Sequence, residues 1–311
     1  MRLVFLGSPP FATPVLARLS RSRFRPLCVV TQPPRGRGRG RKVGESAVAE
    51  LARAEGIELL EPETVRDPAV LAHLGALAPD VFLVVSYGEI LREEFLALPR
   101  VVALNVHPSL LPRHRGATPI PAALLAGDEV TGVAIQKVAK ELDSGDLLLS
   151  RATPIAPGET AGELLARLAQ WSGELVLEAL ELVESGKARY TPQDPARATT
   201  CKKLTKEHGR IDWKRPAREL ERLVRAMNPW PGATTRLAHG AELLVWRARA
   251  ASAEGMTGAE PGTILEAGPR WRVAAGDGTL ELLEVQVAGK RALAADEFLR
   301  GARQQPGQKL G

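Results

Sequence analysis

The first half of the chain alternates short apolar runs with amphipathic segments. Apolar runs of strand length occupy residues 2–6, 26–31, 57–60, 80–85 and 101–106. Helical patterns between them cover residues 12–20, 45–55 and 69–77. Several runs are almost continuously apolar, which is typical of strands buried on both faces of a parallel sheet. The pattern predicts an α/β fold with a Rossmann-like, mostly parallel sheet and helices on both faces.

The pattern changes in the second half. A shorter pair of strands is predicted at 132–138 and 146–149, followed by a long amphipathic helix at 160–185. A helix at 216–226 then precedes short strands at 242–248, 262–265, 271–274 and 280–287, which indicate a small OB-like β-barrel. We therefore expect a catalytic domain over residues 1–186, a linker over 187–209 that is rich in proline, threonine and lysine, and a C-terminal domain over 210–311.

Composition excludes several classes of protein. The 311 residues are 44% hydrophobic and 25% charged, as in ordinary globular chains. Apolar runs such as 81–85 are far shorter than a membrane span, and the first residues lack a secretory signal, so we expect a cytoplasmic protein with no membrane contact. The two cysteines, Cys28 and Cys201, are far apart and show no metal-ligand spacing. We expect neither a disulfide framework nor a metal site.

Charge is distributed unevenly along the chain. Residues 1–186 carry 20 basic and 22 acidic side chains, whereas residues 187–311 carry 22 basic and 14 acidic ones. The net charge of residues 1–186 is therefore near zero, whereas that of residues 187–311 is strongly positive. This asymmetry indicates that the second part approaches a polyanion.

The most informative stretch runs from Asn105 to Gly116 and follows the strand predicted at 101–106. Ligands of open α/β sheets bind near the carboxyl ends of the strands. Residues two apart on a strand point the same way, so Asn105 and His107 can address one site. An asparagine amide can donate to a developing oxyanion and a histidine can move a proton near neutral pH. An isolated pair of this kind is nevertheless more often structural.

A second motif changes that interpretation. Residues 141–146 form a glycine-containing turn with three carboxylates, among them Asp143. Taken together, N-x-H-x-S-L-L-P-x-x-R-G at 105–116 and L-D-x-G-D at 142–146 resemble the signature of the 10-formyltetrahydrofolate-dependent formyltransferases. The rest of the chain is similar to the members of that family that formylate initiator methionyl-tRNA. Similar segments include F-L-G-S-P-P-F-A at 5–12, S-Y-G at 86–88, R-I-D-W at 210–213 and N-P-W-P at 228–231.

The resemblance implies the reaction and the roles of its residues. The formyl group of 10-formyltetrahydrofolate, used as a co-substrate, passes to the α-amine of methionine on initiator tRNA, without a metal. Asn105 stabilises the oxyanion, His107 transfers protons, and Asp143 orients His107 and favours its protonated form. Which of His107 and Asp143 removes the amine proton stays open. The folate lies along Ser109, Leu110, Leu111 and Pro112, with its pterin near Tyr87.

Two basic segments are the candidates for tRNA binding. Residues 35–42 hold five positive charges in eight residues and no acid, with glycine at alternate positions. This segment resembles the family's inserted loop beside the acceptor end of the tRNA, and we assign Arg37, Arg39, Arg41 and Lys42 to it. Lys202, Lys203 and Lys206 lie in the second segment and could follow the tRNA backbone. The simpler interpretation of residues 35–42 is a solvated loop. That of the second segment, residues 197–225, is an exposed linker followed by an amphipathic helix.

Two other functions stay open at this point. A related formyltransferase could act on a small-molecule amine or hydrolyse the folate, but such an enzyme needs no basic loop and no basic C-terminal domain. A non-catalytic RNA-binding protein needs none of Asn105, His107 and Asp143. We therefore expect an enzyme acting on tRNA, as a monomer.

Overall fold

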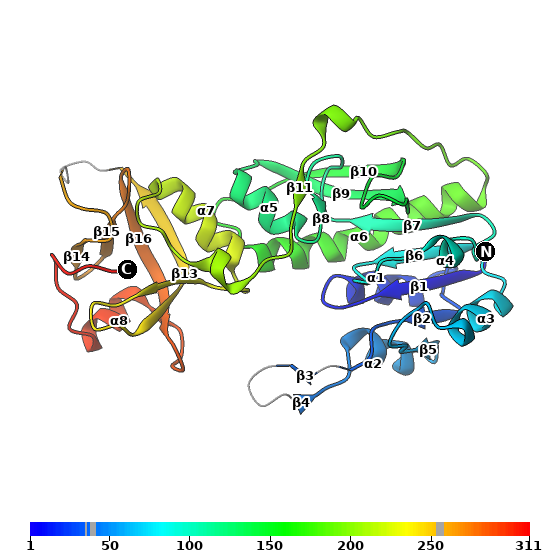
Figure 1. Cartoon of the computed structure of the whole chain (residues 1–311), viewed down its shortest axis with the longest axis horizontal. Helices are drawn as coiled ribbons and strands as arrows, with labels where there is room; N and C mark the ends of the chain where they lie inside the picture. Colours follow the sequence, from blue (N-terminus) through cyan, green and yellow to red (C-terminus); the bar gives the residue numbers. More distant parts are fainter. Residues whose placement is uncertain (35, 38–41, 253–257) are drawn as a thin grey trace. The chain divides into compact units, whose positions relative to one another are not determined.

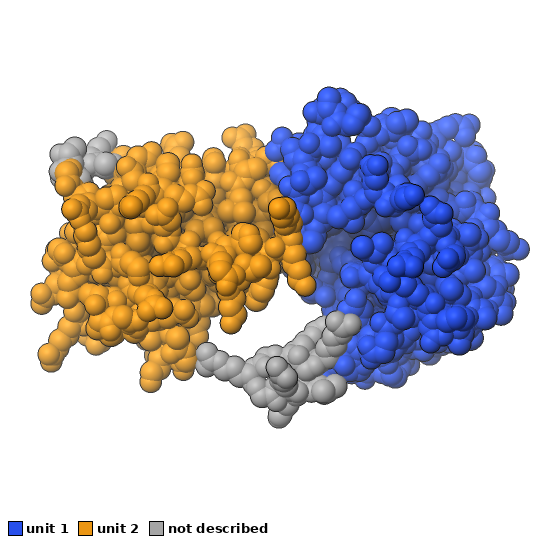
Figure 2. Space-filling model, in the orientation of Figure 1, with its two compact units in different colours: residues 1–119, 130–154, 165–201 blue, residues 120–129, 155–164, 202–311 orange. Residues whose placement is uncertain are grey.

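The computed structural model describes residues 1–34, 36–37, 42–252 and 258–311. The chain forms two compact units, coloured separately in Figure 2. Unit 1 comprises residues 1–119, 130–154 and 165–201, and unit 2 comprises 120–129, 155–164 and 202–311. This division differs from the contiguous domains expected from the sequence. Two short segments of the front half belong to unit 2, and most of the expected linker, up to Cys201, belongs to unit 1.

A seven-stranded sheet forms the centre of unit 1 (Figure 1). Its strand order is β10-β9-β7-β6-β1-β2-β5, and the last five of these are parallel. β9 pairs antiparallel with both β7 and β10. The strands are β1 (Leu3–Gly7), β2 (Cys28–Val30), β5 (Glu58–Leu60), β6 (Val81–Val85), β7 (Val102–His107), β9 (Val130–Lys137) and β10 (Leu147–Pro154). The predicted mostly parallel sheet is confirmed.

Helices cover both faces of this sheet. Every residue of β1 and β6 is buried, as the continuous apolar runs predict. On one face, alternate residues of β1, β2 and β6 pack with Leu74 and Phe95, which belong to α3 and α4. On the other, α1 lies against α6 where Gly173 meets Arg18. The helices of unit 1 are α1 (Ala12–Ser20), α2 (Ala47–Ala54), α3 (Pro68–Ala76), α4 (Glu93–Leu96) and most of α6 (Ala161–Glu184), whereas α5 (Pro119–Ala126) belongs to unit 2 from its second residue.

Unit 2 contains an antiparallel sheet. The strand order of this sheet is β12-β13-β16-β15-β14, with β17 paired to β16, and α7 packs against β13 and β16. Register shifts between Val245 and Ala248 interrupt the pairing of β13 with β16. The elements are η2 (Lys206–Gly209), α7 (Ala217–Met227), β12 (Ala233–Arg236), β13 (Glu242–Ala251), β14 (Ile264–Ala267), β15 (Trp271–Ala274), β16 (Thr279–Val287), β17 (Leu293–Ala294) and α8 (Ala295–Gly301). The small C-terminal β domain predicted as an OB-like barrel is confirmed, and its strands form an antiparallel sheet.

Short elements of unit 1 were not predicted. After the 3₁₀ helix η1 (Pro195–Arg197), the expected linker forms β11 (Thr200–Cys201), which pairs in parallel with β8 (Arg115–Gly116). In the basic segment, β3 (Gly36–Arg37) pairs with β4 (Lys42–Val43) as a hairpin. Over the described ranges, no helix is both long enough and apolar enough to cross a bilayer.

Candidate active site

The strand β7 carries the first two predicted catalytic residues. Asn105 and His107 are two residues apart on it and therefore point to the same side of the sheet. Because β7 pairs antiparallel with β9, Asn105 lies directly opposite Gln136 and His107 opposite Ala134. The register thus places a second carboxamide, that of Gln136, beside Asn105. Gln136 is 1% exposed.

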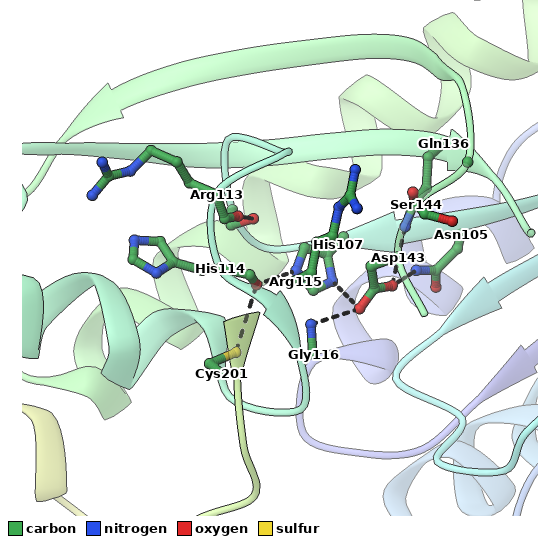
Figure 3. A network of polar contacts seen from close by, with 12 residues as sticks. Asn105, His107, Arg113, His114, Arg115, Gly116, Gln136, Asp143, Ser144 and Cys201 are labelled. Carbon is green, nitrogen blue, oxygen red and sulfur yellow. Dashed lines mark hydrogen bonds and ion pairs between the residues drawn. The ribbon is translucent and has the colours of Figure 1, made fainter. Parts of the chain in front are cut away.

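Asp143 lies in the connection between β9 and β10 and points at Asn105 and His107 (Figure 3). Its Oδ1 accepts hydrogen bonds from Asn105 Nδ2 at 3.2 Å and Gln136 Nε2 at 3.0 Å. Its Oδ2 accepts one from the backbone N–H of Gly116 at 2.8 Å. The backbone of Asp143 has φ 51°, in the left-handed region that non-glycine residues seldom adopt. Three donors therefore hold a carboxylate on a strained turn.

His107 is buried between two acceptors. Its Nε2 lies 2.9 Å from the carbonyl oxygen of His114, so this nitrogen carries a proton that it donates. Its Nδ1 lies 3.6 Å from Asp143 Oδ2, a distance that permits an ion pair but exceeds a good hydrogen bond. Burial lowers the pKa of His107 below its ordinary value of 6.5, and this effect outweighs the opposite influence of Asp143. Asp143 favours the imidazolium as expected, but the buried ring as a whole favours the neutral form.

The loop after β7 closes around this site. Gly116 has φ 118°, and a Cβ there would lie 2.1 Å from the carbonyl oxygen of Cys201, so only glycine fits. Cys201 is the residue that pairs with Gly116 in the β8–β11 ladder. The thiol of Cys201 also lies 3.6 Å from the carbonyl oxygen of His114. The segment expected to be a linker thus holds the loop after β7 in place. This loop supplies the carbonyl of His114 to His107 and the N–H of Gly116 to Asp143.

The predicted folate residues occupy the turn between β7 and β8. Ser109 is fully buried and donates from Oγ to the carbonyl of Arg113 at 2.7 Å. Leu111 is also buried, whereas Leu110 and Pro112 are partly exposed. The contribution of this turn to folate binding stays a prediction.

Tyr87, predicted to lie near the pterin ring, is buried in the core of unit 1, and its contribution to folate binding stays a prediction. It is 1% exposed and packs in the core cluster with Phe82 and Phe95. Its hydroxyl has no hydrogen-bond partner within the described part of the chain, and burial raises its pKa. Any contact of residue 87 with a ligand at the surface would therefore involve its backbone.

The predicted tRNA-binding residues divide into three groups. Arg37 and Lys42 are paired positions of the β3–β4 hairpin, whereas Arg39 and Arg41 lie outside the described residues. Lys202, Lys203 and Lys206 are exposed. Their contact with tRNA stays a prediction.

Two glutamines of this network were not predicted from the sequence. Gln136 contacts Asp143 directly, and Gln193, from the expected linker, contacts Gln136. The signal for Gln136 was its place on β9, which pairs opposite Asn105 only once the strand register is known. Gln193 gave no local signal, because 57 residues separate it from Gln136.

Comparisons with known proteins identify the family of the chain. A model of the formyl transferase family matches residues 1–180, and a model described as "Formyl transferase, C-terminal domain" matches residues 203–303. A curated relative from Roseiflexus castenholzii, named "Methionyl-tRNA formyltransferase", is 45% identical over 100% of this chain and 99% of its own length. The chain belongs to the methionyl-tRNA formyltransferase family. A second relative of the same name, from Agathobacter rectalis, is 39% identical over 99% of this chain and 98% of its own.

Solved structures of lower identity share the fold. The family member from Clostridium thermocellum has a TM-score of 0.56 at 14% identity, covering 80% of this chain and 93% of its own. The sugar 3N-formyl transferase WlaRD has a TM-score of 0.67 at 14% identity, covering 94% of this chain and 99% of its own. In the ranges that the structure describes, no group of three or more histidine, cysteine or acidic side chains is arranged to hold a metal ion.

Proposed function

We propose that this member of the family transfers the formyl group of 10-formyltetrahydrofolate to the α-amine of methionine on initiator methionyl-tRNA. It does so in the cytoplasm, for translation initiation, and acts as a monomer. Full-length similarity to relatives with the corresponding name supports the proposal. The observation that carries it is the convergence of an amide, an imidazole and a carboxylate from β7 and the β9–β10 connection.

The reaction has two demands that these groups fit. The uncharged amine attacks the formyl carbon, and the carbonyl oxygen becomes an oxyanion. The bond from carbon to N10 of the folate then breaks, N10 takes a proton, and the amine nitrogen loses one. The site must therefore stabilise an oxyanion and move a proton, and neither demand requires a metal or a covalent enzyme intermediate.

Asn105 is suited to stabilising the oxyanion. Its amide nitrogen carries two hydrogens, and one of them is donated to Asp143 Oδ1. This bond fixes the plane of the amide, so the second hydrogen is held in one direction. A donor fixed in advance costs no reorganisation when charge develops on the substrate.

The pair of His107 and Asp143 is suited to transferring the proton. His107 Nδ1 is the nitrogen without a hydrogen bond, and it faces Asp143 Oδ2 at 3.6 Å. With the ring held neutral by burial, the pair accepts the amine proton and returns one proton to N10. Because the two groups face each other at this distance, we assign the role of base to the pair rather than to either residue.

The basic surface supports a polyanionic acceptor. Lys203 and Lys206 are exposed in a part of the chain that carries 22 basic and 14 acidic residues from 187 onwards. Such contacts give affinity that depends on salt but not on sequence. A small amine as acceptor would need none of these charges.

The decisive experiment offers three acceptors side by side. Purified enzyme and 10-formyltetrahydrofolate are incubated with charged initiator tRNA, with charged elongator tRNA, and with an amine precursor of the purines. The proposal predicts rapid formylation of the initiator tRNA alone. Equal or faster formylation of the small amine would contradict it.

The basic segment, residues 35–42, is tested separately. Replacing Arg39, Arg41 and Lys42 by alanine should raise the KM for charged initiator tRNA and flatten its salt dependence, because phosphate contacts release counterions. Affinity for the folate should not change. An equal loss of folate affinity would argue that the segment belongs to the folate site instead.

A further inference from the structure

A chain of side chains leads from a guanidinium to the catalytic carboxylate. Arg115 donates from Nε and Nη2 to Gln193 Oε1 at 3.0 and 2.7 Å. Gln193 Nε2 donates to Gln136 Oε1 at 3.0 Å, and Gln136 Nε2 donates to Asp143 Oδ1 at 3.0 Å. Two carboxamides thus connect a positive charge to a negative charge, each accepting at one end and donating at the other.

The two ends of the chain fix the orientation of both amides. If Gln136 were turned over, its oxygen would face the carboxylate of Asp143. If Gln193 were turned over, its nitrogen would face the donors of Arg115. Each amide polarises the next, because aligned hydrogen bonds strengthen one another in a buried network. Gln136 is almost fully buried, so it has no access to water as an alternative partner.

Gln193 also holds the backbone of the turn that carries Asp143. Its Nε2 lies 3.0 Å from the carbonyl oxygen of Asp143 and 2.7 Å from that of Gly145. Two residues earlier, Thr191 forms an antiparallel bridge with Leu147 at the end of the same turn. These contacts restrain a residue whose φ of 51° is unfavourable without support.

The same segment restrains the loop on the other side of the site. Thr199 Oγ1 accepts a hydrogen bond from the backbone N–H of His114 at 2.9 Å. The carbonyl of Thr199 accepts one from the N–H of Arg115 at 2.9 Å. Residues 191–201 therefore connect the two loops that supply the partners of His107.

We infer that Gln193 is a positioning residue for formyl transfer, which acts by orienting the amide of Gln136 and the turn of Asp143 around the His107–Asp143 pair. The inference rests on the proposed function for its chemistry. Gln193 itself contacts no reacting atom. Its contribution is to keep the three donors directed at the carboxylate, so that Asp143 keeps its position beside Nδ1 of His107.

The sharpest test is Gln193→Glu, which keeps the size and the acceptors for Arg115 but removes the N–H donors. Gln136 would then turn its nitrogen toward the new carboxylate and its oxygen toward Asp143. We expect kcat to fall about tenfold or more, the size of one hydrogen bond to a charged group, with little change in KM for the folate. Gln170→Glu, the same substitution at an exposed position of α6, is the matched control and should leave kcat unchanged.

A pH profile separates positioning from a general loss of structure. Gln193→Glu reverses the amide of Gln136, and Gln193→Met removes the donor that fixes the orientation of this amide. Either change weakens the hydrogen bond from Gln136 to the carboxylate of Asp143, so the acid limb of kcat should move to higher pH in both variants. The titratable groups near Asp143 are the ring of His107 and the thiol of Cys201, with Arg115 two amides away. A profile displaced in neither variant would overturn the inference.

A double-mutant cycle tests whether Gln193 acts through Gln136. Gln136→Met and Gln193→Met should each lower kcat, and the double variant should lose less than the product of the two losses. Losses that multiply would contradict the relay. The NMR titration of His107 in the free enzyme should also move in Gln193→Met, and this readout needs no acceptor. An unmoved titration would sink the inference, whereas failure of the wild type to formylate tRNA would sink the proposed function alone.

Discussion

Asp143→Asn isolates the charge of the carboxylate from its shape. The substitution keeps every atom in place, but one carboxylate oxygen becomes an amide nitrogen. If its oxygen continues to accept from Asn105 and Gln136, its nitrogen faces the N–H of Gly116, which lies 2.8 Å from Asp143 Oδ2. The opposite orientation turns the nitrogen toward two donors and is worse. In the more favourable orientation the variant loses the hydrogen bond from Gly116, which is buried and charge-assisted in the wild type. This loss lowers the free energy of unfolding by about 1.5–3 kcal/mol.

The effect on turnover should be much larger than the effect on stability. Without the carboxylate, His107 lacks the charge that stabilises its protonated form, and proton transfer loses about 10²- to 10⁴-fold in rate. Steady-state formylation of charged initiator tRNA at saturating substrate measures kcat, and urea denaturation measures stability. Asp67→Asn is the control, because Asp67 is an exposed N-cap of α3, outside the active-site network, where asparagine caps equally well. A kcat for Asp143→Asn within threefold of the wild type would refute the role of the pair.

Three further predictions follow from the same site. Asn105→Ala should lower kcat about 10²- to 10³-fold by removing an oxyanion donor, and a loss confined to KM in steady-state kinetics would contradict that role. Gly116→Ala should lower Tm and activity together, since its Cβ meets the carbonyl of Cys201 at 2.1 Å, whereas Gly158→Ala, with open space around its Cβ, should not lose activity. Burial lowers the pKa of His107 below 6.5, so the wild type should lose stability relative to His107→Gln as pH falls below about 6.5. Urea denaturation of both proteins at two pH values checks this. A wild type that becomes more stable than His107→Gln as the pH falls would show that the pKa of His107 is raised instead.

The sheet could be predicted from the sequence because its strands are continuous apolar runs. The residues of β1 and β6 are buried on both faces, and such runs are unambiguous when helical patterns separate them. The placement of Asn105 and His107 on one side followed from the two-residue period of a strand. Helix α5 was missed because its eight residues, Pro119–Ala126, are apolar all round and show no amphipathic period.

The rest of the site depends on contacts between distant parts of the chain. Gln136 lies opposite Asn105 only in the antiparallel register of β7 and β9, and the spacing of the residues does not specify that register. Gln193 lies in a stretch whose prolines and threonines have the composition of a linker. Its pairing with the active-site loops depends on the parallel ladder of β8 and β11, two residues long. Local patterns carry no information about so short a pairing.

The most direct test is a crystal structure of the enzyme with a stable formyl-bearing analogue of its donor, 5-formyltetrahydrofolate. The account predicts that the formyl group lies beside the pair of His107 and Asp143, with its oxygen within about 3 Å of Asn105 Nδ2. A donor bound with its formyl group remote from Asn105 and His107, while both keep the positions described above, would contradict it.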